Sequence, residues 1–122
     1  MRDVIHKFKF KGDPMVLCAP PALQESIVEL GYKTYLEVGI RSKNTLVFVN
    51  DKEDFLNFLE KDLRALEPDG VLWFAYPKQS SKIKTDIHRD ILWQLAQPYG
   101  FTAVSAISID ETWSALRFKP LK

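Results

Sequence analysis

The feature that most constrains the fold is an apolar run at residues 71–76, Val-Leu-Trp-Phe-Ala-Tyr, in which polar and apolar side chains do not alternate. A strand with one face in water alternates, because successive side chains point to opposite faces of the sheet. A run without alternation is typical of a strand covered on both faces, as in the centre of a parallel sheet. The sequence therefore predicts a buried central strand here, after a Pro-Asp-Gly turn at residues 68–70.

Strand-like and helix-like segments alternate through most of the chain. Apolar runs predict buried strands at residues 15–19 and 45–49, and residues 32–38 form a less regular candidate. Apolar side chains spaced by three or four residues predict a helix after 15–19, after 45–49 and after 71–76. Asn50 is well placed to cap the second of these helices.

The chain closes with two strand-like segments, residues 101–109 and 112–118. Only Asp110 and Glu111 separate them, which leaves room for a tight reversal, so this pair is predicted to be antiparallel. The order β-α-β-β-α-β-α-β-β implies right-handed crossovers, with helices on both faces of one sheet. We therefore predict an α/β fold, a three-layer sandwich whose mostly parallel, Rossmann-like sheet ends in an antiparallel hairpin.

The length of 122 residues suits a single domain, residues 1–122, and no linker or repeat interrupts the pattern. Residues 1–13 are basic and contain alternating lysine and phenylalanine, which fits a short edge strand and equally a flexible arm. The exposed sheet edge expected beside this arm would allow a homodimer.

Composition narrows the range of partners and locations. The net charge of +1 falls short of the basic excess of dedicated nucleic-acid binders, so nucleic acid is not an expected partner. No apolar run approaches the roughly 20 residues of a membrane-spanning helix, and the N-terminus lacks a signal-peptide core, so no membrane association is expected. A single cysteine forms no internal disulfide, which favours a reducing, cytoplasmic setting.

Polar and basic side chains are concentrated in one loop, residues 77–86, between the central strand and the next helix. The loop is expected at the carboxyl edge of the sheet, where open α/β sheets bind ligands. Its hydroxyls, its lysines and the N-terminus of the helix, capped by Thr85 or Asp86, could hold a phosphate or a carboxylate. The alternative is a solvated loop without a ligand. The candidate anion-binding residues are Lys78, Ser80, Ser81, Lys82, Lys84, Thr85 and Asp86.

Charged residues near the start of that helix form a second candidate. Asp86 and Asp90 are four residues apart and share a helix face. Together with Arg89 and Arg117 they could form a charge network beneath the loop. A pair of carboxylates could perform acid–base chemistry, but the favoured interpretation is a helix cap with a structural ion pair.

The reversal before the last strand supplies Asp110, Thr112 and Trp113. Asp110 is predicted to accept hydrogen bonds from the backbone amides of its own turn. Trp113 is predicted to pack in the core with its indole N–H on an acceptor, and ligand stacking is the minor alternative.

Residues that usually carry metal or nucleophilic chemistry are scarce. Cys18, at the predicted end of the first strand, has no adjacent base or cation, so it is predicted to be a small core residue rather than a nucleophile. His6 and His88 lack partners at metal-ligand spacing, and His88 is expected on a helix surface. The sequence predicts no metal site.

The segment Leu66-Glu67-Pro68-Asp69-Gly70-Val71-Leu72-Trp73 leads into the central strand, and an antiparallel hairpin is predicted to end the chain. In these features the last three predicted strands and their helices, within residues 66–118, resemble the second half of a methyltransferase-type Rossmann sheet. More narrowly, these residues resemble an uncharacterised bacterial family, which implies a fold and no established activity. The narrower resemblance rests on Trp73-x-Ala75-Tyr76-Pro77-Lys78, Thr85-Asp86, Arg89-Asp90 and Asp110-x-Thr112-Trp113-Ser114-Ala115-Leu116-Arg117-Phe118.

The methyltransferase resemblance also indicates where a cofactor would be expected. Members that bind S-adenosylmethionine place a glycine-rich loop after the first strand, whereas this chain continues as Cys18-Ala19-Pro20-Pro21-Ala22. The two prolines remove two N–H donors, and no glycine appears between the first strand and Gly31. Glu37, near the end of the second candidate strand, is the residue that would hold a ribose. We therefore expect no cofactor.

These observations favour a small α/β module without catalytic activity. It would bind a small anionic or phosphorylated ligand, or a protein partner, through the loop at residues 77–86. The alternative is a divergent S-adenosylmethionine-dependent, methyltransferase-like enzyme that uses the same strand-end crevice, with Lys78, Lys84 and Asp86 in its site. A weak nucleic-acid contact through the lysines of residues 7–11 and of the loop is disfavoured by the near-neutral charge.

Overall fold

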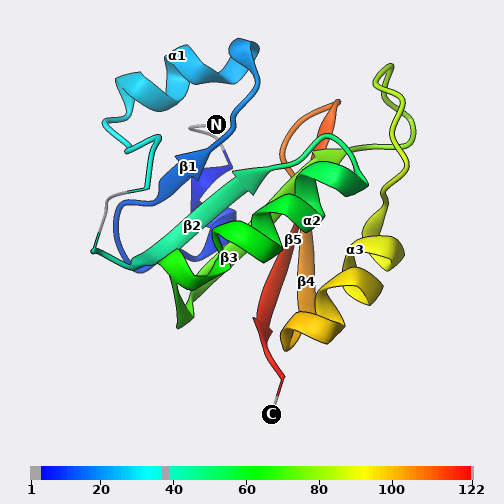
Figure 1. The fold of residues 1–122 in the computed structure, drawn as a ribbon. Coiled ribbons are helices and arrows are strands. Elements are labelled where there is room, and N and C mark those ends of the chain that lie inside the picture. Colours follow the sequence, from blue (N-terminus) through cyan, green and yellow to red (C-terminus); the bar gives the residue numbers. More distant parts are fainter. Residues whose placement is uncertain (1–3, 37–38, 122) are drawn as a thin grey trace.

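The chain folds around one five-stranded sheet, seen in Figure 1 in the computed structural model, which describes residues 4–36 and 39–121. Its strands are β1 (Met15–Leu17), β2 (Ser42–Phe48), β3 (Leu66–Pro77), β4 (Phe101–Ser108) and β5 (Trp113–Pro120). Its helices are η1 (Ile5–Phe8), α1 (Pro21–Glu29), α2 (Lys52–Lys61), η2 (Leu63–Ala65), α3 (Arg89–Ala96) and η3 (Gln97–Tyr99), where η marks a 3₁₀ helix. None of the described helices is long and apolar enough to cross a membrane.

The strand order confirms the predicted fold class. The order is β1-β2-β3-β5-β4, with β1, β2 and β3 paired in parallel. The terminal hairpin is antiparallel, as predicted, and β5 lies between β3 and β4. The sheet is therefore parallel except for β5, and it is open at both edges.

Helical segments cover both faces of the sheet. On one face, α2 and α3 pack over Phe74, Leu116 and Phe118. On the other face, η1 and α1 contribute Phe8 and Ile27 to a second apolar cluster, which contains the opposite side chains of the same strands. Residues 71–77 of β3 are all buried, so the central strand predicted from the unalternating run is confirmed.

The N-terminal segment is neither an edge strand nor a free arm in its described part. Residues 5–8 form η1, and the side chain of Phe8 is completely buried beneath the sheet. Its ring stacks on Phe10 and meets the edge of Trp73. The indole nitrogen of Trp73 donates a 2.8 Å hydrogen bond to the carbonyl oxygen of Phe8. Apolar burial and this bond hold the segment, which a Lys–Phe alternation does not reveal.

Two other local predictions are wrong. The strand expected at residues 32–38 is reduced, in its described part, to a single parallel bridge between Lys33 and Met15; Glu37 and Val38 lie outside the described residues. Residues 68–70 do not form a turn between elements but lie inside β3. There the register shifts, because β3 advances from Leu66 to Val71 while β2 advances from Ser42 to Asn44. The turn-forming composition therefore serves an irregularity within a strand.

The path of the chain around β1 creates a switch point in the sheet. After β1 and α1, the chain returns to pair at Lys33 on one side of β1, and Val16 N donates to the Lys33 carbonyl at 2.8 Å. The next strand, β2, then pairs with the other side of β1. In open α/β sheets such a reversal opens a crevice at the carboxyl ends of the two strands and is the usual ligand site.

The register shift in β3 makes a specific prediction about Gly70. A Cβ atom added at this residue would collide with the backbone of Lys43, chiefly with its carbonyl oxygen. We expect Gly70→Ala to lower the free energy of unfolding by about 1–3 kcal/mol, the usual cost of forced overpacking. Gly12→Ala is the matched control, because its Cβ would meet only the side chain of Asn44 at 3.6 Å. Equal urea midpoints for the two variants would contradict this account.

Candidate functional site

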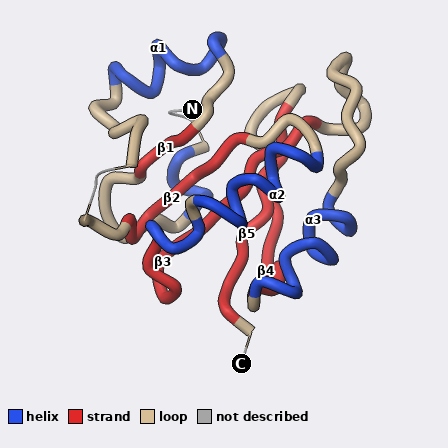
Figure 2. The backbone as a smooth tube through the Cα atoms, viewed as in Figure 1, coloured by secondary structure: helices blue, strands red, loops and turns tan. Residues whose placement is uncertain are grey.

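Most of the chemistry-bearing residues gather at one end of the sheet. The carboxyl ends of β1, β2 and β3, the loop at residues 78–88 and the turn between β4 and β5 all lie there, as Figures 1 and 2 show. This is the edge at which the sequence placed its candidate loop. Two regions of it can be distinguished: a cleft beside β3 and the switch point between β1 and β2.

The first region is an open cleft of about 630 Å³ on the face of the sheet that carries α3. Its walls come from the end of β3, the loop after it, the start of α3 and the hairpin of β4 and β5. Predicted site residues Lys78, Ser80 and Arg89 line it. The remaining polar residues of its lining are Tyr76, Gln79, His88, Asp90, Ser108 and Ser114. Of these, Asp90 was considered from the sequence only in a carboxylate or ion pair and His88 only as a helix-surface residue, and the others were not named as site candidates.

Tyr76 is the buried polar residue of this cleft. Its side chain is 7% exposed, and its hydroxyl makes no hydrogen bond within the described residues. Burial raises the pKa of the Tyr76 hydroxyl; Arg89 opposes this effect and Asp90 adds to it. The hydroxyl is therefore protonated at neutral pH and can donate a hydrogen bond into the cleft. Sequence reasoning counted Tyr76 only as part of the buried strand.

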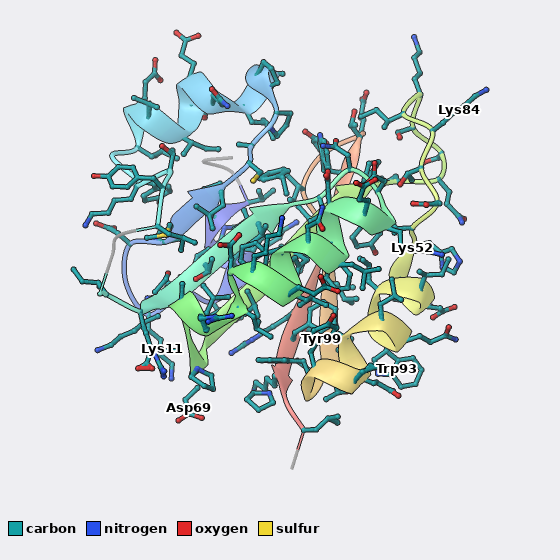
Figure 3. All side chains as sticks on the ribbon, viewed as in Figure 1. Lys11, Lys52, Asp69, Lys84, Trp93 and Tyr99 are labelled. Carbon is teal, nitrogen blue, oxygen red and sulfur yellow. The ribbon has the colours of Figure 1, made fainter. Side chains whose placement is uncertain are left out.

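The predicted anion loop does not bring its lysines together. Lys78 is half-buried, and its Nζ donates a 2.6 Å hydrogen bond to Ser108 Oγ. Ser81 Oγ donates to the Lys78 carbonyl at 2.7 Å and so closes a turn within the loop. Lys82 and Lys84 are exposed, and Lys84 points outward from the loop in Figure 3. Of the predicted cations of the loop, Lys78 alone lines the cleft.

Thr85 and Asp86 do not cap the helix that follows them. That helix, α3, begins at Arg89, with His88 at the capping position. Thr85 Oγ1 instead donates to the Asn50 carbonyl at 2.6 Å, and Asp86 Oδ1 accepts a 2.8 Å hydrogen bond from Lys52 N. Both residues therefore fasten the loop to the N-terminus of α2, a contact over more than 30 residues that local pattern cannot predict.

The charge network proposed for the start of α3 is not formed. Arg89 Nε lies 3.7 Å from Asp90 Oδ1 in an exposed pair, while Asp86 is bonded to α2. Arg117 lies between Leu116 and Phe118 on β5, so its side chain occupies the opposite face of the sheet. Its Nε is buried there without a hydrogen-bond partner in the described structure. Because side chains alternate between the two faces along β5, the Arg117 side chain lies on the face opposite the cleft.

The hydrogen bonds of Asp110 and the burial of Trp113 are as predicted, but the indole N–H of Trp113 has no acceptor within the described residues. Asp110 Oδ1 accepts hydrogen bonds from the backbone N–H groups of Thr112 and Trp113, both at 2.8 Å. The Trp113 side chain is buried, and its ring meets the edge of Phe48 at 5.1 Å between centroids. This turn is structural: it fixes the start of β5, and with it Ser114 in the wall of the cleft.

The second region is the switch point at the ends of β1 and β2. Cys18 follows β1 directly and is exposed, so the prediction of a small core residue is wrong. Its backbone has a φ of 60°, in the left-handed region that non-glycine residues seldom adopt. That turn directs the thiol out of the sheet. Partial loss of its water shell raises the pKa of the Cys18 thiol, and the negative charges of Asp54 and Asp62 raise it further.

Carboxylates from three positions gather at the N-terminus of α2, beside this edge. Asp51, and not Asn50, caps α2 by accepting from Asp54 N at 2.9 Å. Asp54 Oδ2 in turn accepts from Asn50 N at 3.0 Å, and Asp86 bonds to Lys52 N. None of the three carboxylates forms an ion pair within the described residues. This part of the edge therefore carries negative charge and suits a cationic ligand group better than an anionic one.

The prolines after Cys18 begin α1. Pro20 is its capping residue and Pro21 its first helical residue, so the N-terminal turn has fewer free N–H donors than usual. Gln24 Nε2 donates to the Ala19 carbonyl at 3.0 Å. Residues 4–36 and 39–121 contain no group of three His, Cys, Asp or Glu side chains placed to hold a metal ion.

The attachment of the loop to α2 predicts a difference between neighbouring side chains. Asp86→Ala removes the acceptor from Lys52 N, and we expect a loss of about 1 kcal/mol in the free energy of unfolding, as for a lost helix cap. Lys84→Ala should change it by less than about 0.5 kcal/mol, since Lys84 is exposed. Chemical denaturation of both variants measures this difference, and equal losses would show that the hydrogen bond does not hold the loop.

The environment of Cys18 predicts slow alkylation despite its exposure. A raised thiol pKa means that less thiolate is present at pH 8 than in free cysteine, and the thiolate is the reactive form. The rate of reaction with iodoacetamide should therefore rise with pH through a midpoint above that of free cysteine. A midpoint at or below that of free cysteine would contradict the described environment.

Solved structures of methyltransferases share this fold. Ribosomal protein L11 methylase from Lactobacillus delbrueckii subsp. bulgaricus matches with a TM-score of 0.55 and 13% identity, over 92% of this chain and 59% of that one. An S-adenosylmethionine-dependent methyltransferase from Aquifex aeolicus matches with a TM-score of 0.54 and 11% identity, over 96% of this chain and 87% of that one. DhpI, in complex with S-adenosylhomocysteine (SAH), matches with a TM-score of 0.55 and 14% identity, over 90% of this chain and 77% of that one.

This likeness is one of fold. The chain spans 59% of the length of the Lactobacillus protein and 39% of LepI, another similar structure, which was solved with S-adenosylmethionine. No family model matches the chain, and no curated protein sequence matches it. The prediction of a non-catalytic module that binds an anion or a partner through residues 77–86 is overturned by these neighbours, which favour the methyltransferase-like alternative.

Proposed function

We propose that this chain binds S-adenosylmethionine at the carboxyl ends of β1 and β2, as a divergent methyltransferase-like protein. The observation that carries the proposal is the switch point, where the chain pairs first on one side of β1 and then on the other. A reversal of this kind opens a ligand crevice. The sheet around it, with antiparallel β5 between β3 and β4, has the fold of proteins whose structures contain S-adenosylmethionine or SAH.

The residues at the switch point fit such a ligand in charge and in shape. S-adenosylmethionine carries a positively charged sulfonium, and when bound it supplies an electrophilic methyl group. Asp51 and Asp54 would provide the negative potential that this charge requires. The left-handed turn at Cys18 leaves the end of β1 open to solvent, as an approaching ligand requires.

The prolines change how the ligand would be held. Because Pro20 and Pro21 contribute no N–H groups, this edge would rely on side chains more than a glycine-rich loop does. Asn50, exposed at the end of β2, would supply hydrogen bonds to the polar groups of the ligand. Glu37, outside the described residues, keeps the role in ribose binding that the sequence suggested.

The narrower assignments are also proposals. Residues 66–118 would place the chain in an uncharacterised bacterial family, and the single cysteine would place it in the cytoplasm. Neither assignment changes the site proposed at β1 and β2.

Protection of Cys18 tests the proposed site directly. SAH should slow alkylation of Cys18 in proportion to the fraction of protein bound, because the exposed thiol lies at the end of β1 where the ligand would sit. It should also raise the melting temperature, since binding to the folded state stabilises it by mass action. Adenosine alone should protect less, because it lacks the charged amino-acid part.

The control variant moves the thiol to the opposite edge of the sheet. In Cys18→Ser, Val104→Cys the new cysteine lies on β4, at an exposed position remote from β1 in the strand order. SAH should leave its alkylation rate unchanged. Unchanged alkylation of Cys18 together with an unchanged melting temperature at millimolar SAH would refute the proposed function.

A further inference from the structure

The cleft beside β3 is separate from the switch point and has its own unused chemistry. Three parts of the chain that are distant in sequence build it: the end of β3 with its loop, the start of α3, and the hairpin of β4 and β5. Its volume of about 630 Å³ falls within the range of small-molecule sites. None of the described residues that the proposed function places around S-adenosylmethionine lines it.

Tyr76 gives the strongest indication of a ligand. A buried tyrosine hydroxyl normally has a hydrogen-bond partner, because leaving it unpaired costs free energy. Tyr76 is only 7% exposed, yet its hydroxyl makes no hydrogen bond within the described residues. The hydroxyl is not fully sealed from solvent, and Tyr76 lines the cleft. A ligand atom would complete its hydrogen bonding.

The charges around Tyr76 define the class of that ligand. Lys78 and Arg89 are the cations of the cleft and Asp90 is its carboxylate, which leaves a net charge of +1. Lys78 is held in place by its hydrogen bond to Ser108. Ser80 and Ser114 add hydroxyl groups. The lining therefore suits a monoanion better than a dianion, because Asp90 would repel the second negative charge.

The cleft also has an apolar wall. Ala106 of β4 pairs with Leu116 and faces the cleft, where it would contact the body of a small organic molecule. The side chain of Ile107 alternates to the opposite face of the sheet. A carboxylate on a compact apolar body meets both requirements. Its charged end would bind Tyr76, Lys78 and Arg89, and its apolar part would contact β4.

The position of the cleft links it to the proposed function. β2 and β3 are neighbours, and Val49 N donates to the Ala75 carbonyl at 2.9 Å where β2 ends. Thr85 ties the loop of the cleft to Asn50 at the end of β2. A molecule in the cleft would therefore lie one strand away from the ligand proposed at β1 and β2.

We infer that this cleft binds a small organic monocarboxylate, held by the Tyr76 hydroxyl together with Lys78 and Arg89, and that such a molecule is the acceptor substrate. The second part of the inference rests on the proposed function, whereas binding of the carboxylate does not. Tyr76 thereby acquires a role that the sequence did not suggest.

The test uses benzoate as the probe and benzamide as its uncharged counterpart of similar shape. In a titration of the ¹⁵N-labelled chain followed by NMR, benzoate should shift the amide signals of Lys78, Arg89 and Ser114 saturably. Benzamide should bind at least about tenfold more weakly, because hydrogen bonds to a charged group are the stronger ones. Tyr76→Phe should weaken benzoate binding by about tenfold.

Two further variants separate binding from structural effects. Tyr99→Phe is the matched control, because the Tyr99 hydroxyl bonds to Glu60 outside the cleft, and it should leave benzoate binding unchanged. Asp90→Asn should strengthen binding, because it removes the carboxylate from the lining. Damage to the fold would not produce a gain of affinity.

The outcomes distinguish this inference from the proposed function. No saturable shift with benzoate, or equal binding of benzamide, would overturn the inference whatever SAH does. SAH that leaves the signals of Cys18 and Asn50 unchanged, while benzoate binds the cleft, would remove the acceptor role and the proposed function but leave the carboxylate site standing. Saturable shifts from both ligands at their separate sites would support both.

Discussion

Burial of β3 on both faces is the constraint on which the rest of the structure depends. Trp73 faces one cluster and Phe74 the other, and each is 1% exposed. Covering both faces requires helices α2 and α3 on one side and η1 with α1 on the other. The same strand carries Tyr76 to the carboxyl edge, so the packing of its middle fixes the position of the cleft at its end. The hydrogen bond from the Trp73 indole to the Phe8 carbonyl also fixes the N-terminal segment against β3.

The carboxyl edge combines two electrostatic environments. Asp51, Asp54 and Asp86 surround the N-terminus of α2, while Lys78 and Arg89 face the cleft beside β3. A cationic ligand and an anionic one can therefore occupy neighbouring places without competing for the same groups. The loop between β3 and α3 contributes to both places, because its Asp86 turns toward α2 and its Lys78 toward the cleft.

Sequence patterns predicted the parts of the fold that depend on local periodicity. The unalternating run gave β3, helical spacing gave α1 and α2, and the short reversal gave the hairpin with Asp110 bonding its own turn. Predictions failed where distant segments decide the outcome. Thr85 or Asp86 was expected to cap α3, but Thr85 bonds to the Asn50 carbonyl and Asp86 to Lys52 N, both at the start of α2. Arg117 was expected beneath the loop, but its place in the alternation of β5 puts it on the other face.

The candidate site shows the same division. Lys78 and Ser80 could be found because lysines and serines are concentrated in the segment after the central strand, and Arg89 because it lies among the charged residues at the start of the next helix. Tyr76 could not be found in this way, because a tyrosine at the end of an apolar run is predicted to be a core residue. Only the structure shows that its hydroxyl has no hydrogen-bond partner among the described residues. Cys18 was misjudged because its exposure follows from a backbone turn.

The central proposal is that the carboxyl ends of β1 and β2 form a site for S-adenosyl ligands. A crystal structure of the chain grown with SAH tests it most directly. The account predicts density for SAH beside Cys18 and Asn50, with its sulfur atom, which carries the positive charge in S-adenosylmethionine, on the side of Asp51 and Asp54. Density for SAH elsewhere, or a crevice closed by Pro20 and Pro21 against the end of β2, would contradict it.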